Sequence, residues 1–122
     1  MVIAVWVVKI ILAFIFGMAG AIKLSQPKAK LEERMTYTQD FTEGQVRLIG
    51  LLEVLAALGL ILPPLVGVLP QLAGWAAAGL VLVMIGAIVT HLRRNETGAI
   101  GMNVVLLISA AFVAGVYFGV FA

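Results

Sequence analysis

The chain has 122 residues, of which 63% are apolar and only 11% are charged, and its mean hydropathy is +1.16. Soluble domains carry about 25% charged residues, so this composition excludes a soluble globule and indicates one integral membrane domain. The chain has no cysteine, which excludes disulfides, thiolate metal sites and CxxC chemistry. Its net charge of +2 is too small to indicate nucleic acid as a partner.

The hydropathy pattern predicts membrane-spanning helices. Apolar runs cover residues 2–22, 46–62, 72–90 and 100–121, and each length lies within the about 17–25 residues that cross a bilayer as a helix. In lipid every backbone polar group needs an internal partner, and none of the runs shows the alternation of a barrel strand. We therefore expect an all-α, transmembrane four-helix bundle that forms a single domain over residues 1–122. A cleaved signal peptide at residues 2–22 is a weaker alternative, because the run is long and lacks a basic n-region.

The first connection, residues 23–45, is polar and long enough to hold structure of its own. Pro27 is typical of a helix start, and Leu31 and Met35 lie one turn apart, so we expect a helical segment on the membrane surface. The sequence TEGQ at residues 42–45 has the spacing of a capping box, which predicts that the second span begins near Glu43.

The other connections are short, and the basic residues predict the orientation. Pro63, Pro64, Gly67 and Pro70 fill the second connection, and residues 95–98 fill the third. The basic residues in or beside the first and third connections are Lys23, Lys28, Lys30, Arg34, Arg47, Arg93 and Arg94. By the positive-inside rule these connections face the cytoplasm, which places both termini on the extracytoplasmic side of a cytoplasmic (inner) membrane. The aromatic residues expected at the opposite interface are Trp6, Trp75, Tyr117 and Phe121.

Small residues predict where the helices approach one another. Membrane helices pack through glycine and alanine, which allow close backbone contact. The positions expected to pack are Gly17, Gly20, Gly50, Ala57, Gly115 and Gly119. On the fourth span, Ala111, Gly115 and Gly119 recur at every fourth position. That stripe could close the bundle or bind a second copy of the chain.

Glu53 is the most informative polar residue, because a carboxylate at the centre of a spanning helix costs about 2.5–3.5 kcal/mol to insert. Gly50 and Ala57 flank it at i−3 and i+4, so Glu53 is expected to face the bundle. Side chains lean toward the N-terminus of their own helix, and the vectors from Lys23 and His91 therefore converge on Glu53. We expect a polar cluster of these three residues with Asn103.

Two further basic residues, Arg47 and Lys9, and the absence of known catalytic motifs limit the functions that the sequence supports. Arg47 is expected to lean toward water. Lys9 is expected to snorkel to the outer interface, although it shares a face with Ala13 and Gly17. The single histidine and the scattered carboxylates give no metal-ligand spacing, and no nucleotide-binding, nucleophile-elbow or HExxH motif is present. Metal binding and an independent catalytic activity are therefore not expected.

Three segments together resemble the DoxX-like family of small bacterial and archaeal membrane proteins. They are residues 16–24, with Gly17, Gly20 and Lys23, residues 47–63, and residues 86–91. The resemblance implies a four-helix bundle in the cytoplasmic membrane, with the recurrent polar positions of the family at Lys23, Arg47, Glu53 and His91. The family name is tied to membrane subunits of quinone-linked thiosulfate oxidation, and some members are associated with oxidative-stress complexes.

The resemblance and the residues leave several functions open. The first is a noncatalytic subunit of a membrane redox, respiratory or oxidative-stress complex, with another membrane protein or a second copy as partner. The second is a bundle that binds quinone or lipid through a polar cluster around Glu53, since such binding needs only an apolar groove with a few polar contacts. The third is a small proton-coupled carrier. Quinone-reducing bundles of similar architecture use cysteine pairs, which this chain lacks.

Overall fold

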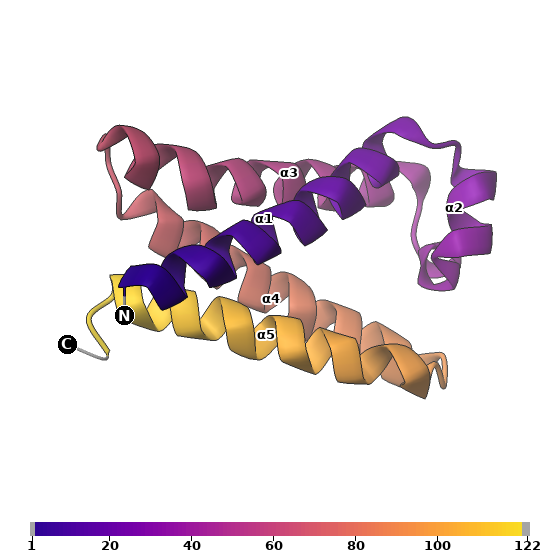
Figure 1. Ribbon diagram of the computed structural model, residues 1–122. Coiled ribbons are helices and arrows are strands. Elements are labelled where there is room, and N and C mark those ends of the chain that lie inside the picture. The colour runs from indigo at the N-terminus through magenta and orange to yellow at the C-terminus, as the bar shows by residue number, and fades with distance from the viewer. Residues whose placement is uncertain (1, 121–122) are drawn as a thin grey trace.

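The computed structural model describes residues 2–120 of the chain, which form long helices joined by short connections (Figure 1). The elements in chain order are α1 (Val2–Ser25), α2 (Lys28–Arg34), the 3-10 helix η1 (Thr36–Asp40), α3 (Glu43–Val66), α4 (Leu72–Arg93) and α5 (Thr97–Tyr117). The helices α1, α3, α4 and α5 are each long and apolar enough to cross a membrane. The predicted membrane-spanning helices are therefore confirmed.

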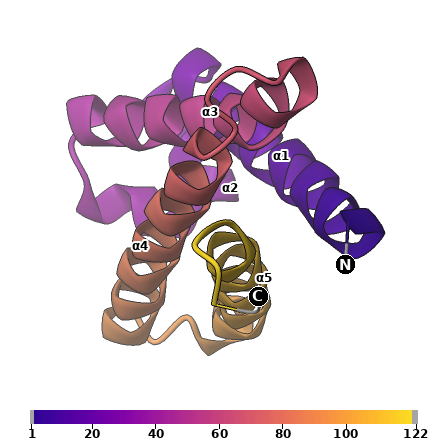
Figure 2. The same ribbon diagram turned by 90° about the vertical axis from the view of Figure 1, so that its left-hand side faces the viewer.

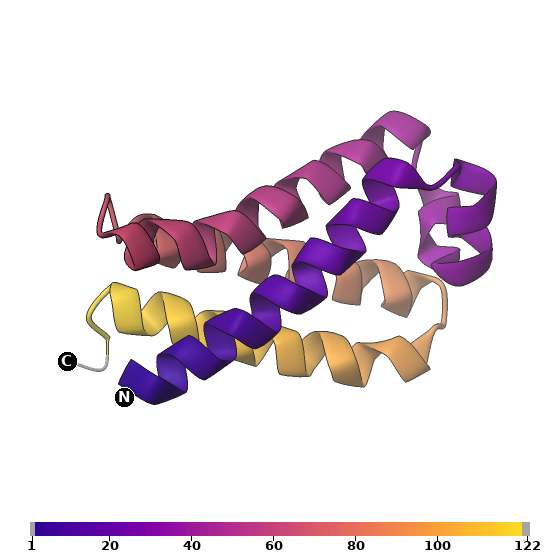
Figure 3. The same cartoon turned by 45° about the horizontal axis from the view of Figure 1, so that its top comes forward.

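The helices pack as two crossed pairs. α1 packs mainly against α3, α4 packs against α5, and α3 also contacts α4. Figure 3 shows α1 running diagonally across the bundle. The N-terminal end of α1 lies beside α5, and the C-terminal end of α1 lies beside α3. Figure 2 shows α3 and α4 diverging from the turn that joins them, with α5 beside α4. Figure 1 shows α2 and η1 at the end of the bundle where α3 begins and α4 ends.

The two ends of the bundle carry different elements. Both described chain ends lie at one end of the bundle, which we call the terminal side, together with the turn between α3 and α4 (Figure 1). The other end carries α2, η1 and the turn between α4 and α5, and we call it the connector side. Which side faces the cytoplasm stays a prediction of the positive-inside rule.

The local signals for helix starts are confirmed. α2 begins directly after Pro27. α3 begins at Glu43 with a complete capping box, in which the Thr42 hydroxyl accepts from the Gln45 amide at 3.1 Å and the Gln45 side chain accepts from the Thr42 amide at 2.9 Å. These two bonds satisfy backbone donors that a helix start leaves without partners.

Three expected boundaries are wrong. α5 begins at Thr97, so Thr97 and Gly98 lie in this helix and not in the third connection. Pro63 and Pro64 lie in the last turns of α3 and not in the connection, which begins only at Gly67. Near a helix end the chain can continue past proline, and here the left-handed Gly67, with φ of 73°, ends the helix. α5 ends at Tyr117, so Gly119 lies in the following turn with φ of 79°. Phe121 lies outside the described residues.

The core is apolar, and so is most of the outer surface. The buried core comes from α1, α3, α4 and α5 and is formed by Leu12, Phe16, Leu60, Ala77, Leu80, Met84, Leu106, Ala110, Val113 and Ala114. Large apolar side chains also face outward, and Ile3, Phe14 and Leu82 are each at least 70% exposed. An apolar exterior of this extent needs lipid around it.

Candidate functional site

A close contact between two glycines determines where α1 and α3 cross. A Cβ atom added at Gly20 would lie 2.5 Å from the Gly50 carbonyl oxygen, and one at Gly50 would lie 2.9 Å from the Gly20 carbonyl oxygen. The two backbones therefore touch, as the small-residue pattern predicts. Gly17 also faces Ala57, with 3.6 Å between the added Cβ and the Ala57 Cβ.

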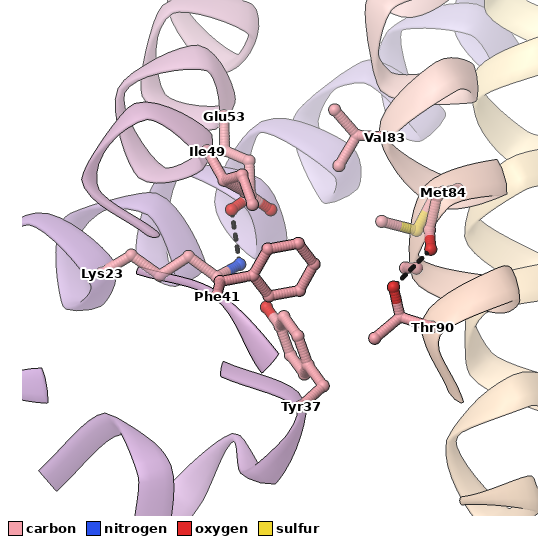
Figure 4. A pocket seen from close by; sticks show the side chains of 10 residues that line it. Lys23, Tyr37, Phe41, Ile49, Glu53, Val83, Met84 and Thr90 are labelled. Carbon is pink, nitrogen blue, oxygen red and sulfur yellow. Dashed lines mark hydrogen bonds and ion pairs between the residues drawn. The ribbon is translucent and has the colours of Figure 1, made fainter. Parts of the chain in front are cut away.

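Lys23 follows Gly20 by three residues and Glu53 follows Gly50 by three, so each lies on the packing face of its own helix. Because α1 and α3 run in opposite directions, the two residues lie on opposite sides of the crossing and their side chains reach across it toward each other. The Lys23 Nζ lies 2.5 Å from the Glu53 Oε1, and the two side chains are 5% and 2% exposed. A charge buried this deeply is stable only with a partner. We call these two residues the polar pair, which is drawn in Figure 4 with its ion pair as a dashed line.

The connection between α1 and α3 folds back to cover the polar pair. The Tyr37 ring centroid lies 5.5 Å from the Lys23 Nζ, and Figure 4 shows its hydroxyl directed toward the pair. The Phe41 ring meets Tyr37 edge-on at 6.3 Å. Burial raises the pKa of the Tyr37 phenol, which the Lys23 ammonium opposes only in part. Tyr37 therefore stays a protonated hydrogen-bond donor at neutral pH.

The polar pair lines a cavity between α3 and α4, which we call the Glu53 cavity. Its volume is about 310 Å³. The lining residues are Lys23, Tyr37, Phe41, Ile49, Glu53, Val83, Met84, Gly86, Ala87 and Thr90. Most of this wall is apolar, and the Thr90 hydroxyl is already used, since it donates to the Gly86 carbonyl at 2.9 Å. The polar pair and Tyr37 remain as the groups that could orient a ligand.

A larger groove lies beside it on the same face, nearer the terminal side. This Trp75 groove has a volume of about 550 Å³, and its wall includes Ala56, Gly59, Trp75, Ala76, Gly79 and Val83. Val83 lines both spaces. The two spaces are therefore neighbours on the α3–α4 face, one with a polar end and one apolar.

His91 does not join the polar pair as the sequence predicts. Its Nδ1 lies 3.0 Å from the Glu96 Oε1, and its ring meets Tyr37 edge-on at 5.3 Å. Tyr37 thus lies between His91 and Lys23. The helices cross and are not parallel, and η1 places an aromatic ring between His91 and Lys23, so the two side chains do not converge.

Glu96 connects η1 to the turn between α4 and α5. It accepts a hydrogen bond from the Thr36 hydroxyl, and the Arg94 Nε lies 3.2 Å from its Oε2. Arg94 also donates to Asp40 at 2.6 Å. The Thr36 bond, with help from Arg94 and His91 and against desolvation, lowers the pKa of the Glu96 carboxyl below its usual 4.5. These bonds hold η1 over the Glu53 cavity.

Asn103 does not join the polar pair, and of that pair Arg47 contacts only the backbone of Lys23. The Asn103 Nδ2 is buried without a hydrogen-bond partner, and Asn103 does not line the Glu53 cavity. Arg47 does not simply lean toward water, since its guanidinium donates to the Lys23 carbonyl and lies 3.3 Å from Glu43. Arg47 therefore caps the end of α1 and positions Lys23.

The expectations for Lys9 and for the stripe on the fourth span are corrected as well. Lys9 is 0% exposed and donates to the Tyr117 hydroxyl at 2.6 Å, so it does not snorkel. The diagonal course of α1 brings it onto α5, where the aromatic partner lies. Gly115 is only half-buried, Ala111 is exposed, and Gly119 is outside α5. The stripe therefore does not close the bundle, and its role toward a second copy stays a prediction.

The fold and the site define a helical membrane protein of four apolar spans with a buried ion pair at a cavity between α3 and α4. Among residues 2–120, no group of three His, Asp or Glu side chains is placed to hold a metal ion. The chain belongs to the DoxX-like family, whose model matches residues 7–113. No curated protein and no solved structure matches it.

Proposed function

We propose that this DoxX-like protein binds an amphiphile of the quinone or lipid class on the α3–α4 face. The observation that carries the proposal is the polar pair at the end of a mostly apolar cavity of about 310 Å³. Ligand sites of this kind combine an apolar wall with a few placed polar groups. The cavity volume suits one substituted ring or one lipid head with its first tail carbons.

The polar groups suit a ligand head with acceptor oxygens. The Lys23 ammonium has three donors, of which Glu53 takes one and Tyr37 a second. One Lys23 donor is left, and the Tyr37 hydroxyl supplies another with its own proton. A carbonyl oxygen of a quinone or an ester oxygen of a lipid can accept from both. The Trp75 groove, which shares Val83 with the cavity, gives an isoprenoid or acyl tail an apolar path along the same face.

Binding a quinone would not by itself make the chain an enzyme. It has no cysteine, so the cysteine-pair chemistry of quinone-reducing bundles is not open to it. We therefore propose a noncatalytic subunit that holds a quinone or lipid beside a redox partner in the cytoplasmic membrane. This role combines the first two functions that the sequence suggests.

A quinone titration tests the ligand. Protein in phosphatidylcholine nanodiscs is titrated with decylubiquinone, and quenching of tryptophan emission reports binding, since Trp75 lines the groove. We expect saturable quenching that Lys23→Met weakens about tenfold or more, because a charge-assisted hydrogen bond is lost. Lys28→Met, a lysine of α2 outside the cavity, is the matched control and should bind like the unaltered protein.

Lipid extracts of the purified protein distinguish the two ligand classes. Bound quinone at near-equal amount supports a quinone site, whereas a phospholipid that decylubiquinone displaces supports a lipid site. The proposal is wrong if nothing is retained and no quenching occurs, or if Lys23→Met and Lys28→Met bind alike.

The groove also favours a second candidate, in which a helix of a partner protein covers the α3–α4 face. A Cβ added at Gly79 or Gly86 would meet nothing within 4 Å, although both glycines line this face. Such a surface allows close approach by another helix. Gly79→Leu should then remove a partner that copurifies at near-equal amount from mildly solubilised membranes, and a chain that purifies alone would count against this candidate.

A further inference from the structure

A second buried cation lies at the terminal side, far from the polar pair. Lys9 lies 14 residues before Lys23 on α1, which is about 21 Å along the helix axis. Its side chain is 0% exposed. The Nζ lies 3.5 Å from the centroid of the Trp6 ring and donates to the Tyr117 hydroxyl at 2.6 Å. Lys9 is thus held by two aromatic side chains that come from α1 and α5.

No carboxylate balances this charge within the part of the chain that the structure describes. The six acidic residues are Glu32, Glu33, Asp40, Glu43, Glu53 and Glu96. Five of them lie on the connector side, and Glu53 is paired with Lys23. Because a buried charge without a counter-charge is costly in lipid, Lys9 needs an anion from outside these residues.

The surroundings of Lys9 leave both space and a donor for such an anion. A cavity of about 300 Å³ lies beside it, and its wall includes Trp6, Lys9, Gln71 and Tyr117. An ammonium has three donors. Tyr117 takes one and the Trp6 face satisfies the charge on a second side, so one donor remains. The Gln71 amide, from the residue before α4, offers further donors at the cavity wall.

From this arrangement we infer a binding site for an oxyanion at the terminal side, with Lys9 as its cation and Gln71 as a second donor. The shared chemistry is a phosphate or carboxylate group. It can come from the headgroup of an anionic lipid or from a free anion in the aqueous phase. This site is separate from the Glu53 cavity and does not depend on the function proposed above.

Trp6 is a built-in reporter, because it contacts Lys9 and lines the cavity. The chain has two tryptophans, so Trp75→Phe leaves Trp6 as the single emitter. This variant is placed in phosphatidylcholine nanodiscs, with or without phosphatidylglycerol, and separately titrated with inorganic phosphate. Lys9→Met is the test, Lys9→Arg keeps the charge, and Lys30→Gln removes an exposed charge on the connector side as the matched control.

We expect phosphatidylglycerol or phosphate to change Trp6 emission, and native mass spectrometry to detect the retained anion. Lys9→Met should weaken binding about tenfold or more, whereas Lys9→Arg and Lys30→Gln should retain it. A response to phosphatidylglycerol alone identifies a lipid headgroup, and a response to phosphate alone identifies a free anion. The inference is overturned if neither probe changes Trp6 emission, or if Lys9→Met and Lys9→Arg bind alike.

Discussion

The polar pair gives the sharpest test of how the bundle is held together. Glu53→Gln keeps the shape and hydrogen-bonding capacity of the side chain but leaves the Lys23 charge without its counter-charge. At the observed N–O distance of 2.5 Å, the attraction between unit charges is about 7 kcal/mol at an effective dielectric constant of about 20. Only part of this is lost, because both groups stay in the membrane on unfolding and find other partners there.

Two measured ranges bound the expected effect. Polar pairs between membrane helices couple by about 0.6 kcal/mol on average and by about 1.7 at most, whereas breaking a buried ion pair costs about 3–5 kcal/mol. The pair is both charged and at most 5% exposed. We therefore expect Glu53→Gln to lower the free energy of unfolding by about 2–4 kcal/mol.

Reversible unfolding in mixed micelles, followed by circular dichroism as the fraction of dodecyl sulfate rises, measures this free energy. The matched control is Glu32→Gln, which breaks the Lys28–Glu32 pair on α2. Its side chains are 28% and 34% exposed, so we expect an effect of at most about 0.5 kcal/mol. The double variant Lys23→Met with Glu53→Leu removes both charges and should return to within about 1 kcal/mol of the unaltered protein.

Two results would refute this reasoning. One is a decrease of less than about 1 kcal/mol in the free energy of unfolding for Glu53→Gln, because the polar pair would then contribute no more than an exposed ion pair does. The other is a double variant that is as unstable as Glu53→Gln, because this would mean that the cost comes from altered packing and not from an unpaired charge.

Three further predictions use the same unfolding assay. Gly20→Ala should lower the free energy of unfolding by about 1–3 kcal/mol, because the new Cβ would lie 2.5 Å from a backbone oxygen of α3. Gly101→Ala is the control, since its Cβ would meet nothing within 4 Å, and it should be neutral or stabilise by up to about 1 kcal/mol. Equal effects of the two substitutions would contradict the close crossing of α1 and α3. The Thr36 hydroxyl lowers the pKa of Glu96 below 4.5, so the stabilisation by the Glu96 carboxylate is present above that pH and is lost as the pH falls below it. Glu96→Gln should therefore lose less stability than the unaltered protein between about pH 5 and about pH 3. The same dependence of the unfolding free energy on pH in both proteins would disprove this. Thr42→Ala should cost about 1 kcal/mol through the lost capping box, and Thr42→Ser should restore it.

Features that depend on local pattern could be predicted from the amino-acid sequence. Four apolar runs define the spans, because hydropathy and length alone decide whether a helix can cross lipid. The capping box defines the start of α3, since its bonds join residues three apart. The packing faces that contain Gly20 and Gly50 and the bundle-facing direction of Glu53 also follow from helical periodicity.

The pairing of side chains across the bundle became clear only from the folded arrangement of the helices. Lys23 reaches Glu53, but His91 pairs with Glu96 and Lys9 meets Tyr117. These choices depend on the diagonal course of α1 and on the way in which residues 26–42 fold back over the bundle, and neither leaves a periodic signal in the sequence. Tyr37 is the clearest case, because nothing in its polar segment indicates that its ring covers a buried ion pair. Side-chain partners in a membrane bundle depend on crossing angles, which result from packing along whole helices.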